Sequence, residues 1–385
     1  MNKKRIISLM LVLAMLFMVG CQADKKPGTT TTPPAQSPAN SSATSGENRP
    51  LKVALLITSI LGDKGFYDSA HAGLALIEKE FPGSTTKVVE MGQDPSTYDA
   101  NIRDIADGDW DYIIVGSSPV LEVLSELAPQ YPDKKFIIFD FEMDWNAGDF
   151  SNVYSVNYKQ NEGTFVAGMV AAIATTELPN SNPEKVIGFI GGMDLPIIND
   201  FLIGYIEGAQ YIEPDIKVAI SYAGVFTDSA KGKELGLSQI TQNKADVMFA
   251  AASATGIGTL EAAQESGVYA IGVDGDQEAA FRETNPALAD SIITSMLKKV
   301  DVSLLRAVKL AEEGKLPWGA NETIGINEDG VGIVVDGRLK EVFNAEQMAR
   351  IEEGIEKVKS GEIKISSAMG MEPEEFQKIA NAVKP

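Results

Sequence analysis

Runs of apolar residues alternate with segments of helical spacing through most of the chain. Compact runs rich in Val, Ile and Leu, such as 51–59 and 134–140, are typical of strands that are buried on both faces. Between them, segments such as 67–81 carry apolar residues at helical spacing. The alternation covers roughly 51–157 and begins again over roughly 184–276. It predicts an α/β protein with two doubly wound parallel-sheet lobes.

Small residues recur along the helical segment 161–175. Its small residues are Gly163, Ala167, Gly168, Ala171 and Ala172. We therefore expect close packing against this helix.

The first 20 residues have the pattern of a lipoprotein signal peptide. Three basic residues at 3–5 precede an apolar stretch over 6–20, which is too short for a membrane-spanning helix. Residues 18–21 resemble a bacterial lipobox that ends in Cys21, the single cysteine of the chain. We expect Cys21 to be acylated and to hold the mature protein on the extracytoplasmic face of the cell membrane. The alternative is an ordinary signal peptide with an incidental cysteine.

Residues 21–50 follow as a tether. After Cys21 this segment is dominated by Thr, Ser, Pro, Ala, Gly and Asn, and it contains no aromatic residue and no Val, Ile or Leu. Such a composition cannot bury enough apolar surface to offset the entropy lost on ordering. We expect a disordered linker between the lipid anchor and the folded part.

The charge of the chain limits its partners. The 385 residues carry a formal net charge of −21. An acidic protein lacks the basic surface that nucleic-acid binding requires, and it is not attracted to anionic lipid. We therefore expect no nucleic-acid partner, and attachment to the membrane through lipid alone.

Few residues are available for enzymatic chemistry. The chain has one histidine, His71, so Ser/His and Cys/His catalysis would all depend on that side chain. His/Cys metal sites lack ligands, and no glycine-rich segment matches a dinucleotide or phosphate loop. We expect no cofactor and no enzymatic activity; a nucleoside hydrolase acting through an Asp cluster is the enzymatic alternative.

Carboxylates and aromatic residues follow the predicted strands. Asp63, Phe66 and Tyr67 come after the first strand, and Asp140 and Asp274 end two later ones. Ligands of doubly wound sheets lie beyond the carboxyl ends of the strands. These residues are therefore expected to line a cleft between the lobes.

Seven sequence blocks in one order over residues 51–335 resemble the basic membrane protein family of lipoprotein receptors, which includes purine nucleoside receptors of ABC importers. Among them are GDKGFYDSAHAGL at 62–74, YAIGVDGDQ at 269–277 and ITSMLKKVDVSLLRAVK at 293–309. The resemblance implies a type I periplasmic-binding-protein fold, whose two lobes are joined by a three-stranded hinge.

The implied lobes are discontinuous in sequence. The N-terminal lobe is expected to contain 51–157 plus about 290–325, and the C-terminal lobe 158–289 plus about 326–385.

The resemblance also implies a binding site. In that family a nucleoside base stacks between aromatic residues, while carboxylates and a lysine hold the ribose. The matching positions here are Phe66, Asp140, Asp274, Asp276 and Lys298, with Phe226 preferred over Phe249 as the second aromatic. We expect Lys298 to lie on a helix. The expected ligand-binding residues are Asp63, Phe66, Tyr67, Asp140, Phe226, Asp274, Asp276 and Lys298.

Two positions depart from the family pattern and bear on the ligand. Tyr67 stands where the family usually has Asn, whose amide can read a purine edge. The family's AGGTG loop is ASATG here, with Ser253 and Ala254 adding bulk.

These observations together predict a monomeric, lipid-anchored receptor that binds a nucleoside, with a purine favoured, and delivers it to ABC permease subunits. The alternative is a signalling receptor of the same fold for a different ribosyl or sugar-like ligand.

Overall fold

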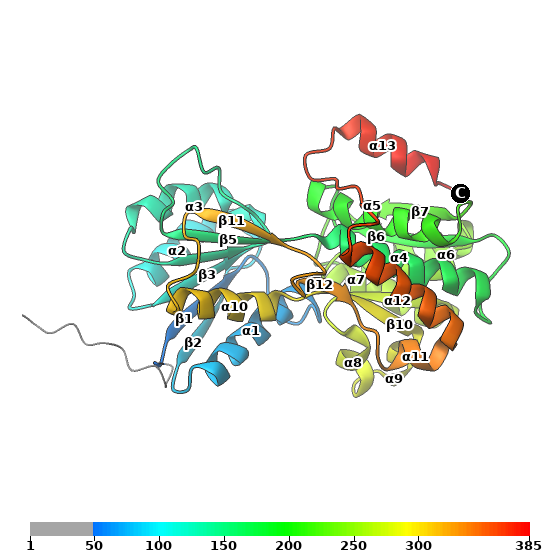
Figure 1. Cartoon of the computed structure of the whole chain (residues 1–385), viewed down its shortest axis with the longest axis horizontal. Helices are drawn as coiled ribbons and strands as arrows, with labels where there is room; N and C mark the ends of the chain where they lie inside the picture. The colour runs from blue at the N-terminus through cyan, green and yellow to red at the C-terminus, as the bar shows by residue number, and fades with distance from the viewer. Residues whose placement is uncertain (1–48) are drawn as a thin grey trace, which may run out of the picture. The chain divides into compact units, whose positions relative to one another are not determined.

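A computed structural model describes residues 49–385, which form two six-stranded sheets covered by helices (Figure 1). The prediction of a two-lobed, doubly wound α/β fold is confirmed. The expected signal peptide 1–20, Cys21 and nearly all of the tether lie outside the described residues. Within residues 49–385, none of the helices combines the length and the apolar character that a membrane span requires.

The first sheet has the strand order β11-β5-β4-β3-β1-β2, and all neighbouring strands in it are parallel. Its strands are β1 (Lys52–Ile57), β2 (Thr85–Glu90), β3 (Tyr112–Gly116), β4 (Phe136–Phe139), β5 (Val153–Tyr158) and β11 (Ala320–Ile324). Its helices are α1 (Phe66–Glu80), α2 (Tyr98–Ala106), α3 (Leu121–Leu127) and α10 (Val300–Glu312). We call this sheet and these helices the first lobe.

The second sheet has the order β12-β10-β9-β8-β6-β7, in which only β12 is antiparallel to its neighbour. Its strands are β6 (Val186–Gly191), β7 (Lys217–Tyr222), β8 (Val247–Ala251), β9 (Tyr269–Asp274), β10 (Ile292–Lys298) and β12 (Val331–Ile333). Its helices are α4 (Gln160–Glu177), α5 (Pro196–Ile212), α6 (Ser229–Gln242), α7 (Ala254–Ser266), α8 (Gln277–Arg282), α9 (Pro286–Ser291), α11 (Arg338–Val342), α12 (Ala345–Lys359) and α13 (Pro373–Ala382). These elements form the second lobe.

The two sheets repeat one topology. Read from β2 and from β7, the strand orders 2-1-3-4-5 and 7-6-8-9-10 are equivalent. The strand order changes direction once in each repeat, between β1 and β3 in the first sheet and between β6 and β8 in the second. In doubly wound sheets the loops at the carboxyl ends of such strands form the ligand crevice.

Burial explains why the apolar runs form strands. Residues 53–57 of β1 and all residues of β3, β4, β6 and β8 are buried. Helices lie on both faces of each sheet, so strands in its middle have no solvent-facing side and require apolar residues throughout.

Three crossovers join the lobes, between β5 and α4, between β10 and α10, and between β11 and β12. The expected start of the returning segment, about residue 290, is wrong because Ile292–Lys298 is a strand of the second sheet. The chain returns to the first lobe only at α10. The expectation that Lys298 lies on a helix is wrong for the same reason, since it is the last residue of β10.

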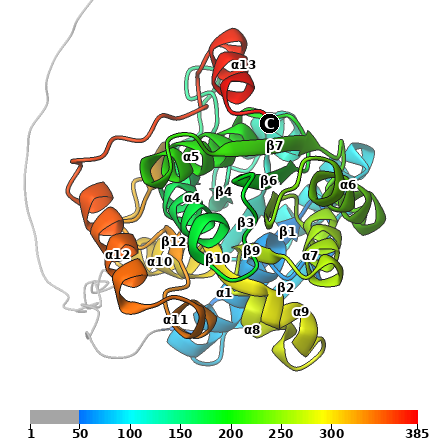
Figure 2. The ribbon, with the colours of Figure 1, turned by 90° about the vertical axis from the view of Figure 1, so that its right-hand side faces the viewer.

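Helices α4 and α5 cross at very short range (Figure 2). A Cβ atom at Gly168 would lie 2.2 Å from the carbonyl oxygen of Tyr205, and one at Gly208 would lie 1.8 Å from that of Phe165. Glycine is therefore required on both helices where their backbones meet. The close approach expected from the small residues of 161–175 is confirmed.

We predict that Gly208→Ala destabilises the protein by about 3 kcal/mol, because its methyl group meets backbone atoms that cannot rotate away. The measurement is the free energy of unfolding in urea.

Gly332→Ala is the matched control, since a Cβ atom there meets nothing within 4 Å. It should change the free energy of unfolding by less than about 0.5 kcal/mol. Equal stabilities for the two variants would contradict the close crossing of α4 and α5.

Candidate functional site

A buried ion pair joins the two lobes. Lys298 ends β10 of the second lobe, and its side chain is only 2% exposed. Its ammonium group donates to the carboxylate of Asp140, which directly follows β4 of the first lobe. A cation with so little access to water requires a partner, and the partner comes from the opposite lobe.

Three aromatic rings surround the same ammonium group. The Nζ atom of Lys298 lies 5.3 Å from the ring centroids of Phe66 and Tyr158 and 5.2 Å from that of Phe201. At these distances the ring faces attract a cation. Phe66 begins α1, Tyr158 ends β5, and Phe201 lies in the second turn of α5.

Sequence reasoning missed Tyr158 and Phe201. Tyr158 ends an apolar strand, and Phe201 lies in an apolar helix, so each has the pattern of a core residue. The available signal was position, because Tyr158 stands at the carboxyl end of a strand in a doubly wound sheet.

Asp274 contributes a buried acceptor without a partner. It ends β9 and is 9% exposed, and its Oδ1 atom has no hydrogen-bond partner among the described residues. Burial raises the pKa of this carboxyl to about 7; Lys298 lowers it, while Asp63 and Asp140 raise it further. An unpaired buried acceptor of this kind can receive a donor from a ligand.

Asp140 and Asp274 hold equivalent positions in the two lobes. Asp140 directly follows β4 and Asp274 ends β9, the equivalent strands of the repeated topology, and both have left-handed backbone conformations with φ of 68° and 65°. Asp tolerates this conformation better than most residues. Burial also raises the pKa of Asp140, and the ammonium group of Lys298 opposes that rise.

Asp63 has all its hydrogen-bonding capacity used by the protein. Its Oδ1 accepts from the backbone N–H groups of Gly65 and Asp68 at 3.1 and 3.2 Å. Its Oδ2 accepts from the N–H of Tyr67 at 3.1 Å and from the hydroxyl of Ser253 at 3.0 Å. In this structure Asp63 holds the start of α1 and contacts the second lobe; its expected contact with a ligand stays a prediction.

Tyr67 packs against Phe66 within the first lobe. Its ring packs edge-on against Phe66 at a centroid distance of 5.0 Å, and its hydroxyl lies 2.9 Å from that of Thr58. Burial raises the pKa of Tyr67 to about 12. The phenol is thus buried and hydrogen-bonded within the first lobe, and its expected contact with a ligand stays a prediction.

The expected residues Phe226 and Asp276, and the alternative aromatic Phe249, have other neighbours. Phe226 packs over Gly192, where a Cβ atom would lie 2.2 Å from its ring. Asp276 caps α8 by accepting from the N–H of Ala279 at 3.1 Å. Phe249 is fully buried in β8, so it offers no face for stacking.

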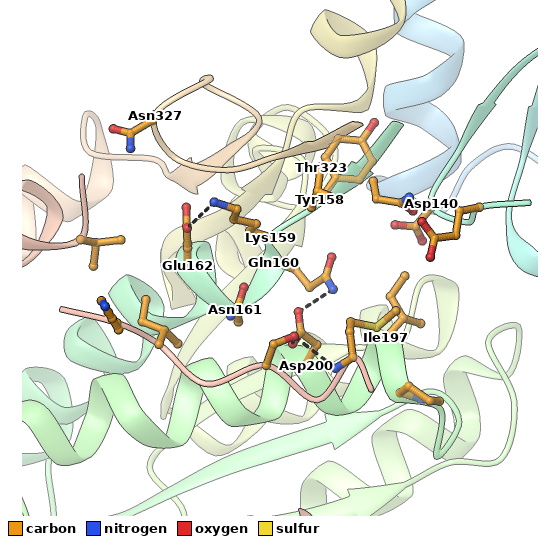
Figure 3. A pocket seen from close by; sticks show the side chains of 18 of the residues that line it. Asp140, Tyr158, Lys159, Gln160, Asn161, Glu162, Ile197, Asp200, Thr323 and Asn327 are labelled. Atoms are coloured by element: carbon orange, nitrogen blue, oxygen red, sulfur yellow. Dashed lines mark hydrogen bonds and ion pairs between the residues drawn. The ribbon is translucent and has the colours of Figure 1, made fainter. Parts of the chain in front are cut away.

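A pocket of about 850 Å³ adjoins the ion pair at Asp140 and Tyr158 (Figure 3). Its wall includes Gln160, whose amide donates to Asp200 at 2.6 Å. The remaining wall comes from first-lobe residues at 118–121 and 140–142, the crossovers at 157–162 and 323–327, the start of α5 and the C-terminal segment 358–369. Volumes of this size hold small organic ligands.

The arrangement is suited to binding. It offers a cation held by a carboxylate, aromatic rings and an unpaired acceptor. His71, the single histidine, lies exposed on α1. No three His, Cys, Asp or Glu side chains of residues 49–385 come together to hold a metal ion.

A family model described as "ABC transporter substrate-binding protein PnrA-like" matches residues 51–368. Basic membrane protein D of Borreliella burgdorferi is 30% identical over 314 residues, covering 80% of this chain and 86% of that protein. A Lactococcus lactis protein named "ABC transporter nucleoside-binding protein BmpA" is 28% identical over 325 residues, covering 81% and 89%.

Solved structures share the fold. An ABC transporter solute-binding protein from Aeropyrum pernix superimposes with a TM-score of 0.74 at 24% identity, covering 87% of this chain and 97% of that one. A solute-binding protein from Conexibacter woesei gives a TM-score of 0.66 at 19% identity, covering 83% and 99%.

Asp274 is predicted to make stability fall as pH rises. Its pKa is about 7 in the folded protein and near 3.8 when unfolded, so between these values the native state binds more protons. The native state therefore loses stability from about pH 4 to pH 7, by on the order of 3 kcal/mol. Asp274→Asn removes this loss, so its advantage over the wild type should grow across that interval when unfolding is measured in urea.

Asp276→Asn is the control, because it exchanges one helix-capping side chain for another. It should keep the pH dependence of the wild type. An advantage of Asp274→Asn that is the same at pH 5 and pH 8 would refute the assignment.

Proposed function

The chain belongs to the family of PnrA-like ABC transporter substrate-binding proteins, and from that premise we propose that it binds a nucleoside between its lobes and delivers it to an ABC permease. Members of this family bind substrates for transport and are not enzymes. The observation that carries the proposal is the buried Lys298–Asp140 pair with its ring of aromatic side chains and the unpaired oxygen of Asp274.

Each part of this cluster suits one part of a nucleoside. Ribose hydroxyls are donors, and the unpaired Oδ1 atom of Asp274 can accept from them, most strongly when the carboxyl is ionised. The base has two π-faces, and Phe66 is the half-buried one of the three rings around Lys298, since Tyr158 and Phe201 are buried. We favour a purine because its larger ring buries more area against an aromatic face.

The charge of the cluster favours a nucleoside over a nucleotide. Asp63 and Asp274 are buried, Asp140 is slightly exposed, and within residues 49–385 Lys298 is the cation that acts on Asp140 and Asp274. A phosphate group brought to this site would meet more negative than positive charge, and burial would weaken its screening by water.

Delivery to a permease requires two states of the receptor. The three crossovers allow the lobes to separate about a hinge, and a ligand held by both lobes favours the closed state. The permease would then recognise the closed, ligand-bound form.

We also propose that the protein is a monomer anchored to the extracytoplasmic face of the cell membrane. The support is the sequence pattern of residues 1–50, with a basic start, an apolar stretch, Cys21 and a Pro/Ser/Thr-rich tether.

Nucleosides are expected to raise the melting temperature of purified protein that has been unfolded and refolded to remove carried-over ligand. Inosine, guanosine and adenosine should shift it more than uridine or cytidine, and ribose or a nucleoside monophosphate should shift it little. The absence of a shift with every nucleoside would overturn the ligand proposal.

Phe66→Leu should weaken binding of the best nucleoside roughly 5- to 150-fold, the loss expected for one base–aromatic stack. The measurement is the dissociation constant by titration calorimetry. Phe150→Leu is the matched control, because Phe150 is buried against Trp145 and does not contact Lys298. If both variants bind like the wild type, Phe66 is not a stacking surface.

Cys21→Ser should move the protein from the membrane fraction to the extracellular or periplasmic fraction, because acyl chains are its proposed attachment. Labelling with radioactive palmitate should be lost in the same variant. Retention in the membrane fraction would show that another segment holds the protein there.

A further inference from the structure

The loop after β8 contains a serine in an unusual backbone conformation. Ser253 has φ of 47° and ψ of −133°, a backbone conformation that residues other than glycine rarely adopt. It is the N-cap residue of α7, a position where serine commonly accepts a hydrogen bond from the first turn of its own helix. Ser253 makes no such bond.

The hydroxyl of Ser253 instead donates to the first lobe. It lies 3.0 Å from Oδ2 of Asp63, a carboxylate that is only 3% exposed. The other three hydrogen bonds of Asp63 come from backbone N–H groups of its own loop and of α1. Ser253 is thus the one residue of the second lobe that bonds this carboxylate.

The neighbouring backbones approach closely at the same place. A Cβ atom at Gly65 would lie 3.1 Å from the carbonyl oxygen of Val273 in β9. The backbones of the two lobes are therefore in direct contact at this place. Another contact between the lobes, from Thr227 to Gln93 at 3.3 Å, is solvent-exposed.

We infer that Ser253 is a positioning residue whose hydrogen bond to Asp63 latches the two lobes together and thereby sets the affinity for ligand. The latch acts without touching the ligand, because it stabilises the closed arrangement that ligand binding requires. Ser253 accepts a strained backbone and an uncapped helix start, and these local costs are offset only when the lobes are closed. The effect on affinity rests on the proposed function, whereas the effect on closure does not.

The test measures closure without ligand. Spin labels are placed at Lys87 and Glu234, exposed positions on the first and second lobes, in a Cys21→Ser background. Ser253→Ala removes the hydroxyl and should increase the population of long inter-lobe distances. It should also weaken binding of the best nucleoside about tenfold, mainly through faster dissociation. An unchanged distance distribution would overturn the latch.

Ser253→Gly separates the latch from ordinary structural damage. Glycine adopts positive φ without strain, so this variant should keep or raise the melting temperature of the ligand-free protein. It should nevertheless open the lobes as Ser253→Ala does. Opening accompanied by a lowered melting temperature in both variants would indicate a structural role instead.

Two further variants complete the design. Thr227→Val removes the exposed contact between the lobes and should change the distances and the affinity less than about twofold. Combining Ser253→Ala with Asp63→Asn should cost less than the sum of the single variants, because both break the same bond. Additive effects would contradict the assigned partner. If Ser253→Ala opens the lobes but no nucleoside binds, the latch proposal stands and the proposal of a nucleoside ligand is refuted.

Discussion

The buried ion pair between Lys298 and Asp140 is the interaction on which the candidate site depends. Lys298 ends a strand of the second lobe and has almost no contact with water, so its charge requires a partner at short range. That partner belongs to the first lobe, and the surrounding rings come from both lobes. The arrangement of these groups therefore exists only while the lobes are together. The site is therefore complete only in the closed arrangement, in which Lys298 and Asp140 form their ion pair.

The closed site contains more carboxyl groups than cations. Asp274 adds a carboxylate that the ion pair does not neutralise, and burial raises its pKa to about 7. Strain accompanies the charge, since Asp140 and Asp274 both adopt left-handed conformations at equivalent strand ends, as do Ser117 and Ser253. Such strain persists where the surrounding structure holds it, and it is concentrated at functional positions. A ligand that donates hydrogen bonds would relieve the unpaired acceptor and so stabilise the closed form.

The fold was predictable because its strands are buried on both faces, which makes apolar runs such as Leu51–Ile57 unambiguous. The carboxyl-end rule correctly brought Phe66, Asp140 and Asp274 to the junction of the lobes. Lys298 was assigned to a helix because β10 passes into α10 with a single residue between them, so the pattern lacks a turn signal. Phe201 and Tyr158 could not be separated from core residues by composition alone. Asp276 caps α8, a role that a carboxylate after a strand can have and that its sequence position did not distinguish from ligand binding.

Asp63 illustrates how local and long-range requirements can meet in one side chain. Its backbone hydrogen bonds hold the start of α1, which carries Phe66, and its remaining acceptor position receives Ser253 from the second lobe. A contact of this kind favours closure whether or not a ligand is present. If it were too strong, the empty protein would close and the permease could not distinguish it from the loaded one. The strained backbone and missing cap of Ser253 lower the net stability that the latch gives to the closed state. The open and closed states of the empty protein then differ little in free energy, and ligand binding shifts the population to the closed state.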